Sequence, residues 1–97
     1  MKRNLSGLRH IIFERDSYTC ILCNRPASDL HHIVSRSQGG SDHPHNLVSL
    51  CRVHHDLMHG IVWAGVGMTQ QEAQQAAIEY ISDYYAMARQ SGKWRGS

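Results

Sequence analysis

Apolar side chains recur at helical spacing near the start and near the end of the chain. The first stripe predicts a helix over about residues 5–16. The second predicts a helix over about residues 69–91, which begins at a capping box of Thr69 and Glu72 and ends at Gly92. The members of this second stripe are Ala73, Ala77, Tyr80, Ile81, Tyr84 and Ala88. We expect this stripe to fold back on the core, although pairing with its copy in a homodimer stays open.

Between these helices the pattern predicts a strand, a loop, a second strand and a short helix. Residues 30–34 and 47–50 are apolar runs of strand length, and the first of them contains two histidines. Residues 35–46 are rich in Gly, Ser, Asp, His and Pro, which is typical of a loop. Residues 52–59 have a helical pattern that ends at Gly60, a residue suited to a C-terminal cap.

Composition favours one small domain whose core alone gives little stability. A chain of 97 residues that is 41% hydrophobic has only a modest core, and domains of this size often need a structural metal. We expect a single domain over residues 1–97, with its core at about residues 15–60. No run is long enough for a membrane span or a secretion signal, so we expect a cytoplasmic protein with no membrane partner. The net charge of +2 fits contact with phosphates but is weak evidence alone.

The cysteines and histidines all fall before Gly60 and supply candidate metal ligands. Three cysteines are an odd number for a closed disulfide framework, whereas x-x spacing is typical of metal ligands. Cys20 and Cys23 form one such pair, and Cys51 and His54 repeat the spacing. Together they would complete a tetrahedral Cys3His site for a structural zinc ion. The alternative is ordinary buried cysteines beside a surface histidine, which the repeated spacing makes less favoured.

The remaining histidines predict a second metal site, one that can perform chemistry. His55 and His59 are four residues apart on the predicted helix, so they share one face. A third imidazole from His31 would leave positions open on the metal for water and substrate. His32 would lie on the opposite face of the strand and could act as a general base. For His59 an alternative is stabilisation by the helix dipole without any ligand role.

Four segments in this region carry a resemblance to a known family. They are Leu30-His31-His32-Ile33-Val34, Gly39-Gly40-Ser41-Asp42, Asn46-Leu47-Val48-Ser49-Leu50-Cys51 and His54-His55. Their order and spacing resemble the HNH endonuclease family with its ββα-metal fold, over about residues 15–60. The cysteine pairs are similar to those of the zinc-stapled branch of this family. The set His31, His55 and His59 is similar to the histidine-rich metal site of colicin-type DNases.

The resemblance implies a small α+β fold with flanking N- and C-terminal helices, and a catalytic set. His32 would activate a water for in-line attack on a phosphodiester. His55 would bind the catalytic divalent metal, which neutralises charge on the phosphate and on the leaving 3′ oxygen. Asn46 would hold the loop between the strands and so keep His32 in register, or it would contact the phosphate. The implied activity is that of a metal-dependent DNA endonuclease that nicks or cuts with low or modest sequence specificity.

Two departures from the family pattern affect the expected metals. Many members carry Asp, a hard oxygen ligand, where this chain has His31. An all-nitrogen set favours Mn²⁺, Co²⁺, Ni²⁺ or Zn²⁺ over Mg²⁺ as the catalytic ion. His54 stands where the family usually has a fourth cysteine, which changes the structural zinc site little because Cys3His is a common set.

The implied partner is double-stranded DNA, bound mainly through its backbone because no sequence-reading element is evident. Arg36 lies beside the predicted active loop and is a candidate phosphate contact, as are Arg15 and Arg52. Charged residues are more often only surface residues. Two alternatives stay open: a zinc-stapled nucleic-acid-binding module without catalysis, and a nuclease that acts on RNA.

Overall fold

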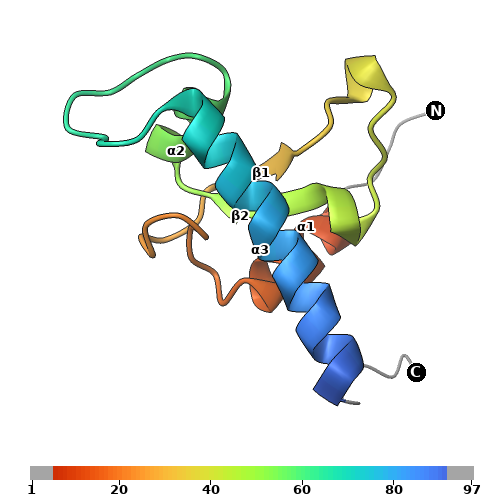
Figure 1. The fold of residues 1–97 in the computed structure, drawn as a ribbon. Helices are drawn as coiled ribbons and strands as arrows, with labels where there is room; N and C mark the ends of the chain where they lie inside the picture. Colours follow the sequence, from red (N-terminus) through yellow and green to blue (C-terminus); the bar gives the residue numbers. More distant parts are fainter. Residues whose placement is uncertain (1–5, 92–97) are drawn as a thin grey trace.

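Residues 6–91 are described by the computed structural model shown in Figure 1. Their elements follow the order α1 (Ser6–Arg15), β1 (Asp29–His32), β2 (Leu47–Leu50), α2 (Arg52–Met58) and α3 (Gln70–Ser91). This part of the chain thus holds a two-stranded antiparallel sheet and three α-helices, which confirms the predicted α+β class. In Figure 1, α3 crosses the front of the hairpin as a long diagonal helix. None of the described helices is long and apolar enough to cross a membrane.

The hairpin ends earlier than the sequence pattern predicts. β2 has the predicted bounds and pairs its Leu47 with His32 at the end of β1, but the predicted strand ran on to Val34. Two residues after the end of β1, Val34 N–H donates to Asn46 Oδ1 at 2.8 Å, and Asn46 Nδ2 donates to Val34 O at 3.0 Å. An asparagine side chain therefore takes the place of a peptide group of the partner strand.

The predicted loop over residues 35–46 contains two short 3-10 turns, η1 (Arg36–Gln38) and η2 (Pro44–Asn46). Gly40 packs directly on the backbone of Val34, where an added Cβ would overlap the carbonyl group. Only glycine therefore allows the loop to approach the end of β1 this closely.

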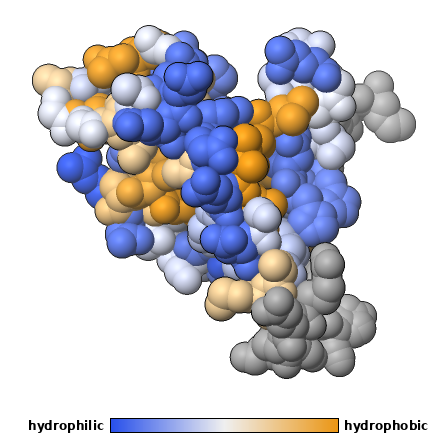
Figure 2. Space-filling model, viewed as in Figure 1, coloured by the Kyte–Doolittle hydropathy of each residue, from blue (hydrophilic) through white to orange (hydrophobic). Residues whose placement is uncertain are grey.

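The apolar stripe of α3 packs on the core rather than lying exposed. Ala73, Ala77 and Ile81 are buried in one cluster with Leu50 of β2 and Leu57 of α2. In Figure 2 a hydrophilic band follows the outward face of α3, with apolar residues on either side. The helix therefore folds back on the strands and α2, which was the favoured expectation.

The start of α3 is closed by the predicted capping box. Thr69 N–H donates to Glu72 Oε1 at 2.9 Å, and Glu72 N–H donates to Thr69 Oγ1 at 3.0 Å. The side chain of Ala88 and all of Gly92 lie outside what the structure describes.

A buried ion pair between Arg15 and Asp16 joins α1 to the rest of the fold. The two side chains are 6% and 0% exposed, and Arg15 Nε lies 2.7 Å from Asp16 Oδ1. Arg15 also donates to Pro44 O at 2.9 Å and to Leu47 O at 2.7 Å. Asp16 accepts a hydrogen bond from the hydroxyl group of Tyr80 at 2.7 Å. The pair therefore links α1, the start of β2 and α3.

The structure corrects one predicted nucleic-acid contact, Arg15. Burial opposes the charge of its guanidinium, but hydrogen bonds to Asp16 and Tyr85 outweigh burial and raise the pKa of Arg15. Burial, together with the hydrogen bond to Asp16, likewise raises the pKa of Tyr80. Because the guanidinium is enclosed and fully engaged inside the fold, Arg15 has no donor to offer a phosphate.

Replacement of Asp16 should therefore destabilise the fold severely. Asp16→Ala leaves a buried guanidinium without its carboxylate, which costs about 3–5 kcal/mol. Urea denaturation of the wild type and the variant measures the loss. Asp83→Ala, at an exposed position of α3, is the matched control and should stay within about 0.5 kcal/mol of the wild type. Equal stability of the two variants would contradict the structural role of the pair.

Candidate functional site

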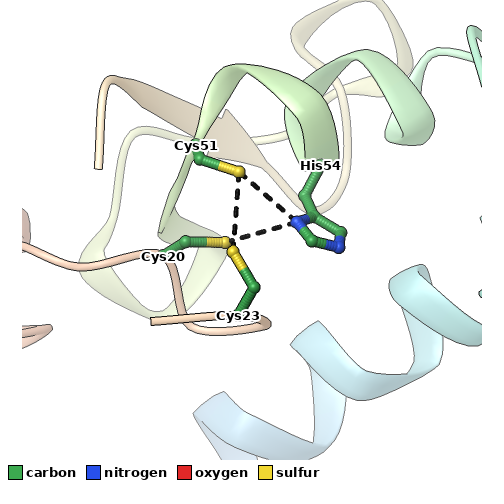
Figure 3. A group of neighbouring side chains, drawn as sticks. All are labelled: Cys20, Cys23, Cys51 and His54. Atoms are coloured by element: carbon green, nitrogen blue, oxygen red, sulfur yellow. Dashed lines mark hydrogen bonds between the residues drawn. The ribbon is translucent and has the colours of Figure 1, made fainter. Parts of the chain in front are cut away.

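Four side chains from two separate segments form the first cluster, which is drawn in Figure 3. Cys20 and Cys23 come from the turn that follows α1, Cys51 is the N-cap of α2, and His54 lies in the first turn of α2. One ligand atom of each lies within 4.8 Å of the others. Figure 3 shows the three sulfurs and one ring nitrogen of His54 directed toward one another. The predicted first set of ligands is therefore brought together.

The distances in this cluster fit a tetrahedral metal ion. Metal–sulfur bonds of about 2.3 Å place two sulfurs of a tetrahedron about 3.8 Å apart. Cys23 Sγ lies 3.7 Å from Cys51 Sγ, and His54 Nδ1 lies 3.4 Å from Cys51 Sγ and 3.8 Å from Cys20 Sγ. His54 thus presents Nδ1, a detail that residue spacing could not predict. The Cys3His cluster could hold one metal ion.

The pKa shifts in the cluster differ from one ligand to the next. All three cysteines are free thiols, and burial raises the pKa of Cys20 to about 11. Burial opposes ionisation of Cys51 as well, but hydrogen bonds from the backbone of α2 and from the neighbouring thiols outweigh it and lower the pKa of Cys51. Burial lowers the pKa of His54, which keeps the imidazole neutral and able to act as a ligand.

Three imidazoles form the second cluster. His31 projects from β1, His55 from α2, and His59 caps the C-terminal end of α2. Their ligand atoms also lie within 4.8 Å of one another. The Nε2 atoms of His55 and His59 are 3.3 Å apart, close to the separation of about 3.4 Å that two nitrogens take on a tetrahedral ion.

The inner member of this cluster is an unpaired polar group. His31 is 6% exposed, and its Nε2 atom is buried without a hydrogen-bond partner. A buried nitrogen in this state normally costs stability, so it fits a site that receives a ligand bond. Burial, reinforced by the nearby His55 and His59, lowers the pKa of His31 to about 4. Burial also lowers the pKa of His55, so both rings are neutral near pH 7 and can act as metal ligands.

A carboxylate that the sequence reasoning missed lies behind His55. Asp29 Oδ2 is 3.5 Å from His55 Nδ1, the nitrogen on the far side from His59. Arg52 lies 3.4 Å from the other carboxylate oxygen of Asp29. A carboxylate behind a ligating imidazole orients the ring and increases its basicity. The available signal was strand alternation, because Asp29 and His31 are two residues apart and share a face of β1.

His32, the predicted base, lies half-buried beside this cluster. Its Nε2 is 2.8 Å from Asp42 Oδ1. Asn46 does not contact His32 directly. Its amide bonds both backbone groups of Val34 and also donates to Ser41 O at 2.9 Å. These bonds hold the loop against the end of β1, whereas the part of Asn46 in catalysis stays a prediction.

One groove of about 1020 Å³ gathers most of the predicted site residues. His31, His32, His55, His59 and Arg36 line it, together with residues of η1 and the first turns of α3. Neither Arg15 nor Arg52 lies in its wall; Arg52 is 60% exposed on α2 and contacts Asp29 and Asp56. A histidine cluster that could hold a metal ion and the predicted base His32 thus open onto the same space.

Residues 20–59 match the family model of the HNH endonucleases. The matched segment begins at Cys20 of the first cluster and ends at His59 of the second. It contains the β1–β2 hairpin and α2, which is the ββα arrangement of this family. No curated protein matches the chain. The match supports an HNH domain with nuclease activity in general.

Loss of a metal from the first cluster should unfold the segments that this cluster joins, the turn after α1 and the start of α2. A metal held by such a set contributes on the order of 10 kcal/mol to folding. We expect Cys23→Ser to bind less metal and to unfold at a markedly lower temperature. Elemental analysis and thermal unfolding, each with and without a chelator, measure these effects. His10→Ala, an exposed histidine of α1 outside both clusters, serves as the control. A Cys23→Ser protein with unchanged metal content and Tm would refute the assignment.

Proposed function

We propose that the chain is a metal-dependent DNA endonuclease that hydrolyses phosphodiester bonds by nicking or cutting. The observation that carries this proposal is the shared groove, in which His31, with its unpaired Nε2, clusters with His55 and His59 while His32 lines the same wall. Metal-assisted hydrolysis needs a cation at the phosphate and a base at the attacking water, side by side. The family match of residues 20–59 supports the same chemistry.

In this proposal His31, His55 and His59 hold the divalent metal through ring nitrogens. When bound, the metal supplies positive charge that stabilises the phosphate and the leaving 3′ oxygen. His32 accepts a proton from a water molecule, whose oxygen forms the new bond to phosphorus. The bond from phosphorus to the 3′ oxygen breaks, and that oxygen leaves with a proton taken from solvent. Asn46 keeps the loop closed, and so keeps its residues in position opposite His32.

The two clusters call for different ions. The first, with three thiols and one imidazole, is a structural zinc site in this proposal. The second offers nitrogen ligands alone, a set that favours Mn²⁺, Co²⁺, Ni²⁺ or Zn²⁺ over Mg²⁺. His59 is the exposed member of the second cluster and lines the groove, so water and substrate could reach an ion held there.

Nucleic acid would meet the groove through its backbone. Arg36 is 45% exposed and lines the groove, so its guanidinium can reach a phosphate. Arg52 is exposed on α2 and can contact a neighbouring phosphate. Backbone contacts of this kind carry no sequence information, which supports low or modest specificity on double-stranded DNA. The apolar face of α3 is already covered by the core, which favours a monomer.

Removal of the base should abolish cleavage without disturbing the fold. General-base catalysis contributes about 10²- to 10⁴-fold, so His32→Ala should nick supercoiled plasmid slower by that factor. The assay is run with Mn²⁺, with and without EDTA. His10→Ala, an exposed histidine of α1 outside the groove, is the matched control. Nicking by His32→Ala at the wild-type rate would mean that His32 is not the base.

Removal of an exposed metal ligand should change the metal requirement. We expect His59→Ala to need at least about tenfold more metal for half-maximal nicking, because one nitrogen of the set is lost. Titration of the nicking rate with Mn²⁺, Co²⁺, Ni²⁺, Zn²⁺ and Mg²⁺ gives the metal order and the shift. Binding of DNA without nicking in every metal would instead favour a non-catalytic module. Faster cleavage of RNA than of DNA would change the proposed substrate.

A further inference from the structure

The loop between α2 and α3 carries an exposed apolar segment, residues 61–63. Figure 2 shows apolar residues at the upper left of the molecule, where Figure 1 draws this loop. Further along the same loop, Val66 and Met68 pack against the core, so the loop is anchored to the fold. The exposed members are Ile61 at 57%, Val62 at 67% and Trp63 at 46%.

The segment lies next to the groove. The loop follows His59 and leads into Thr69, and both of these residues line the groove. Two residues of chain span at most about 7 Å, so the segment begins within that distance of the second cluster's exposed imidazole. A nucleic-acid strand that reached the second cluster would therefore pass close to residues 61–63.

The end of α2 fixes the direction in which the segment leaves the helix. Gly60 N–H donates to Leu57 O at 2.9 Å, and Gly60 has a φ of 87°. Ile61 N–H donates to Asp56 O, also at 2.9 Å. These two bonds form the Schellman motif, in which the residue after the glycine usually packs on an apolar side chain of the last turn. At the corresponding position of α2 this chain has the carboxylate of Asp56, and Ile61 is exposed.

The carboxylate of Asp56 instead holds the indole ring of Trp63. Trp63 Nε1 donates to Asp56 Oδ2 at 2.9 Å. An indole has one donor and no acceptor, so this bond uses its whole capacity for conventional hydrogen bonds. The exposed part of the ring can then contact a ligand only through its apolar edge and its π-face. Because the bond also restrains the ring, a ligand that stacks on it has little left to order.

A cation lies beside this ring. Arg52 Nη1 is 3.7 Å from Asp56 Oδ1, and the Arg52 side chain is largely exposed. Arg52, Asp56 and His59 follow one another at helical spacing along one face of α2. An exposed guanidinium suits phosphate oxygens, and an exposed aromatic ring suits the face of a base. Together they match the two parts of a nucleic-acid strand whose bases are unpaired.

The size of the segment favours a base over a protein partner. A stable protein interface takes about 20–30 residues from each side. Residues 61–63 are far fewer, and α2 borders them with the charged side chains of Arg52 and Asp56. A single base, by contrast, matches the indole ring in size and shape.

We propose that Trp63 is a stacking platform for an unpaired base of the substrate, held beside the groove by Asp56, with Arg52 on a neighbouring phosphate. This inference rests on the proposed nuclease function and narrows its substrate to DNA in which a base has left the helical stack, as at a bulge. In a fully matched duplex the bases stay stacked on one another and present only their backbone to the ring. The protein therefore binds a bulged duplex more tightly than a matched one.

Fluorescence of Trp63 tests this contact directly. The chain has two tryptophans, so Trp94→Phe leaves Trp63 as the sole indole, and His32→Ala in the same protein slows cleavage during the titration. A duplex with one bulged base should quench the emission, whereas the matched duplex of the same sequence should change it little. Stacking on an aromatic side chain is worth about 5- to 150-fold in affinity per base, so the bulged duplex should bind more tightly by that factor.

Substitutions then separate stacking from a general apolar contact. Trp63→Ala should lose the preference for the bulged duplex, measured by the anisotropy of labelled DNA, and should keep its affinity for the matched duplex. Trp63→Tyr retains an aromatic face and should recover part of the preference. Val62→Ala removes a more exposed apolar side chain without a π-face, so it is the matched control and should bind as the wild type does. Equal losses in Val62→Ala and Trp63→Ala would overturn the stacking role.

The outcomes distinguish this inference from the nuclease proposal. Binding of the bulged duplex with unchanged Trp63 emission would overturn the inference and leave the nuclease proposal intact. Self-association that shields Trp63 without DNA, seen by sedimentation as a mass that rises with concentration, would also overturn it in favour of a second copy of the chain. Quenching by the bulged duplex, together with a wild type that nicks in no metal, would support the inference and overturn the nuclease proposal.

Discussion

The arrangement of the whole site depends on the first turn of α2, where the adjacent residues His54 and His55 face different ligand clusters. α2 has seven residues, too few for a helix that is stable alone in water. Its start is held by Cys51 and His54 in the first cluster, and its end by Leu57 and Met58 in the core. A metal bound in the first cluster would therefore fix the position and rotation of α2, and with them the direction of His55. A metal in the first cluster would in this way govern the geometry of the second cluster.

The second constraint is the loop between the strands, in which side-chain hydrogen bonds replace the backbone pairing of a sheet. Asn46 pairs with Val34 as a strand would, and Gly40 allows the backbone to close against β1. The buried pair of Arg15 and Asp16 secures the far end of the same loop, since Arg15 donates to Pro44 O and Leu47 O. Regular pairing could not place Asp42 opposite His32 in so short a hairpin. The irregular loop thus brings the Asp42 carboxylate to within 2.8 Å of His32 Nε2.

Local patterns predicted much of this structure, because both ligand clusters rest on short spacings. Two x-x pairs and a pair of histidines four residues apart lie on adjacent turns, whatever the rest of the fold does. The capping box and apolar stripe of α3 are local in the same sense. Arg15 was mistaken for a surface contact because its partner Tyr85 and the network partner Tyr80 lie at the other end of the chain. Strand alternation indicates that Asp29 shares a face of β1 with His31, but its contact with His55 also depends on where α2 packs. The contact of Asp42 with His32 depends on the path of the whole loop, so residue spacing does not predict it.

The helix α3 completes the groove, although it lies outside the segment that matches the HNH family. Gln74 Nε2 donates to Ile33 O at 2.9 Å, just past the end of β1, and Gln70 Nε2 donates to Met58 O at 2.9 Å, at the end of α2. These two hydrogen bonds connect α3 to β1, which carries His31, and to the end of α2, where His59 lies. They also pair the carbonyl groups of Ile33 and Met58, which lie at the ends of a short strand and a short helix, where regular backbone partners run out. A matched segment of forty residues contains every candidate ligand but buries little apolar surface by itself. The helix supplies that burial through Ala73, Ala77 and Ile81, and its first turns form part of the wall of the groove in which the chemistry is proposed to occur.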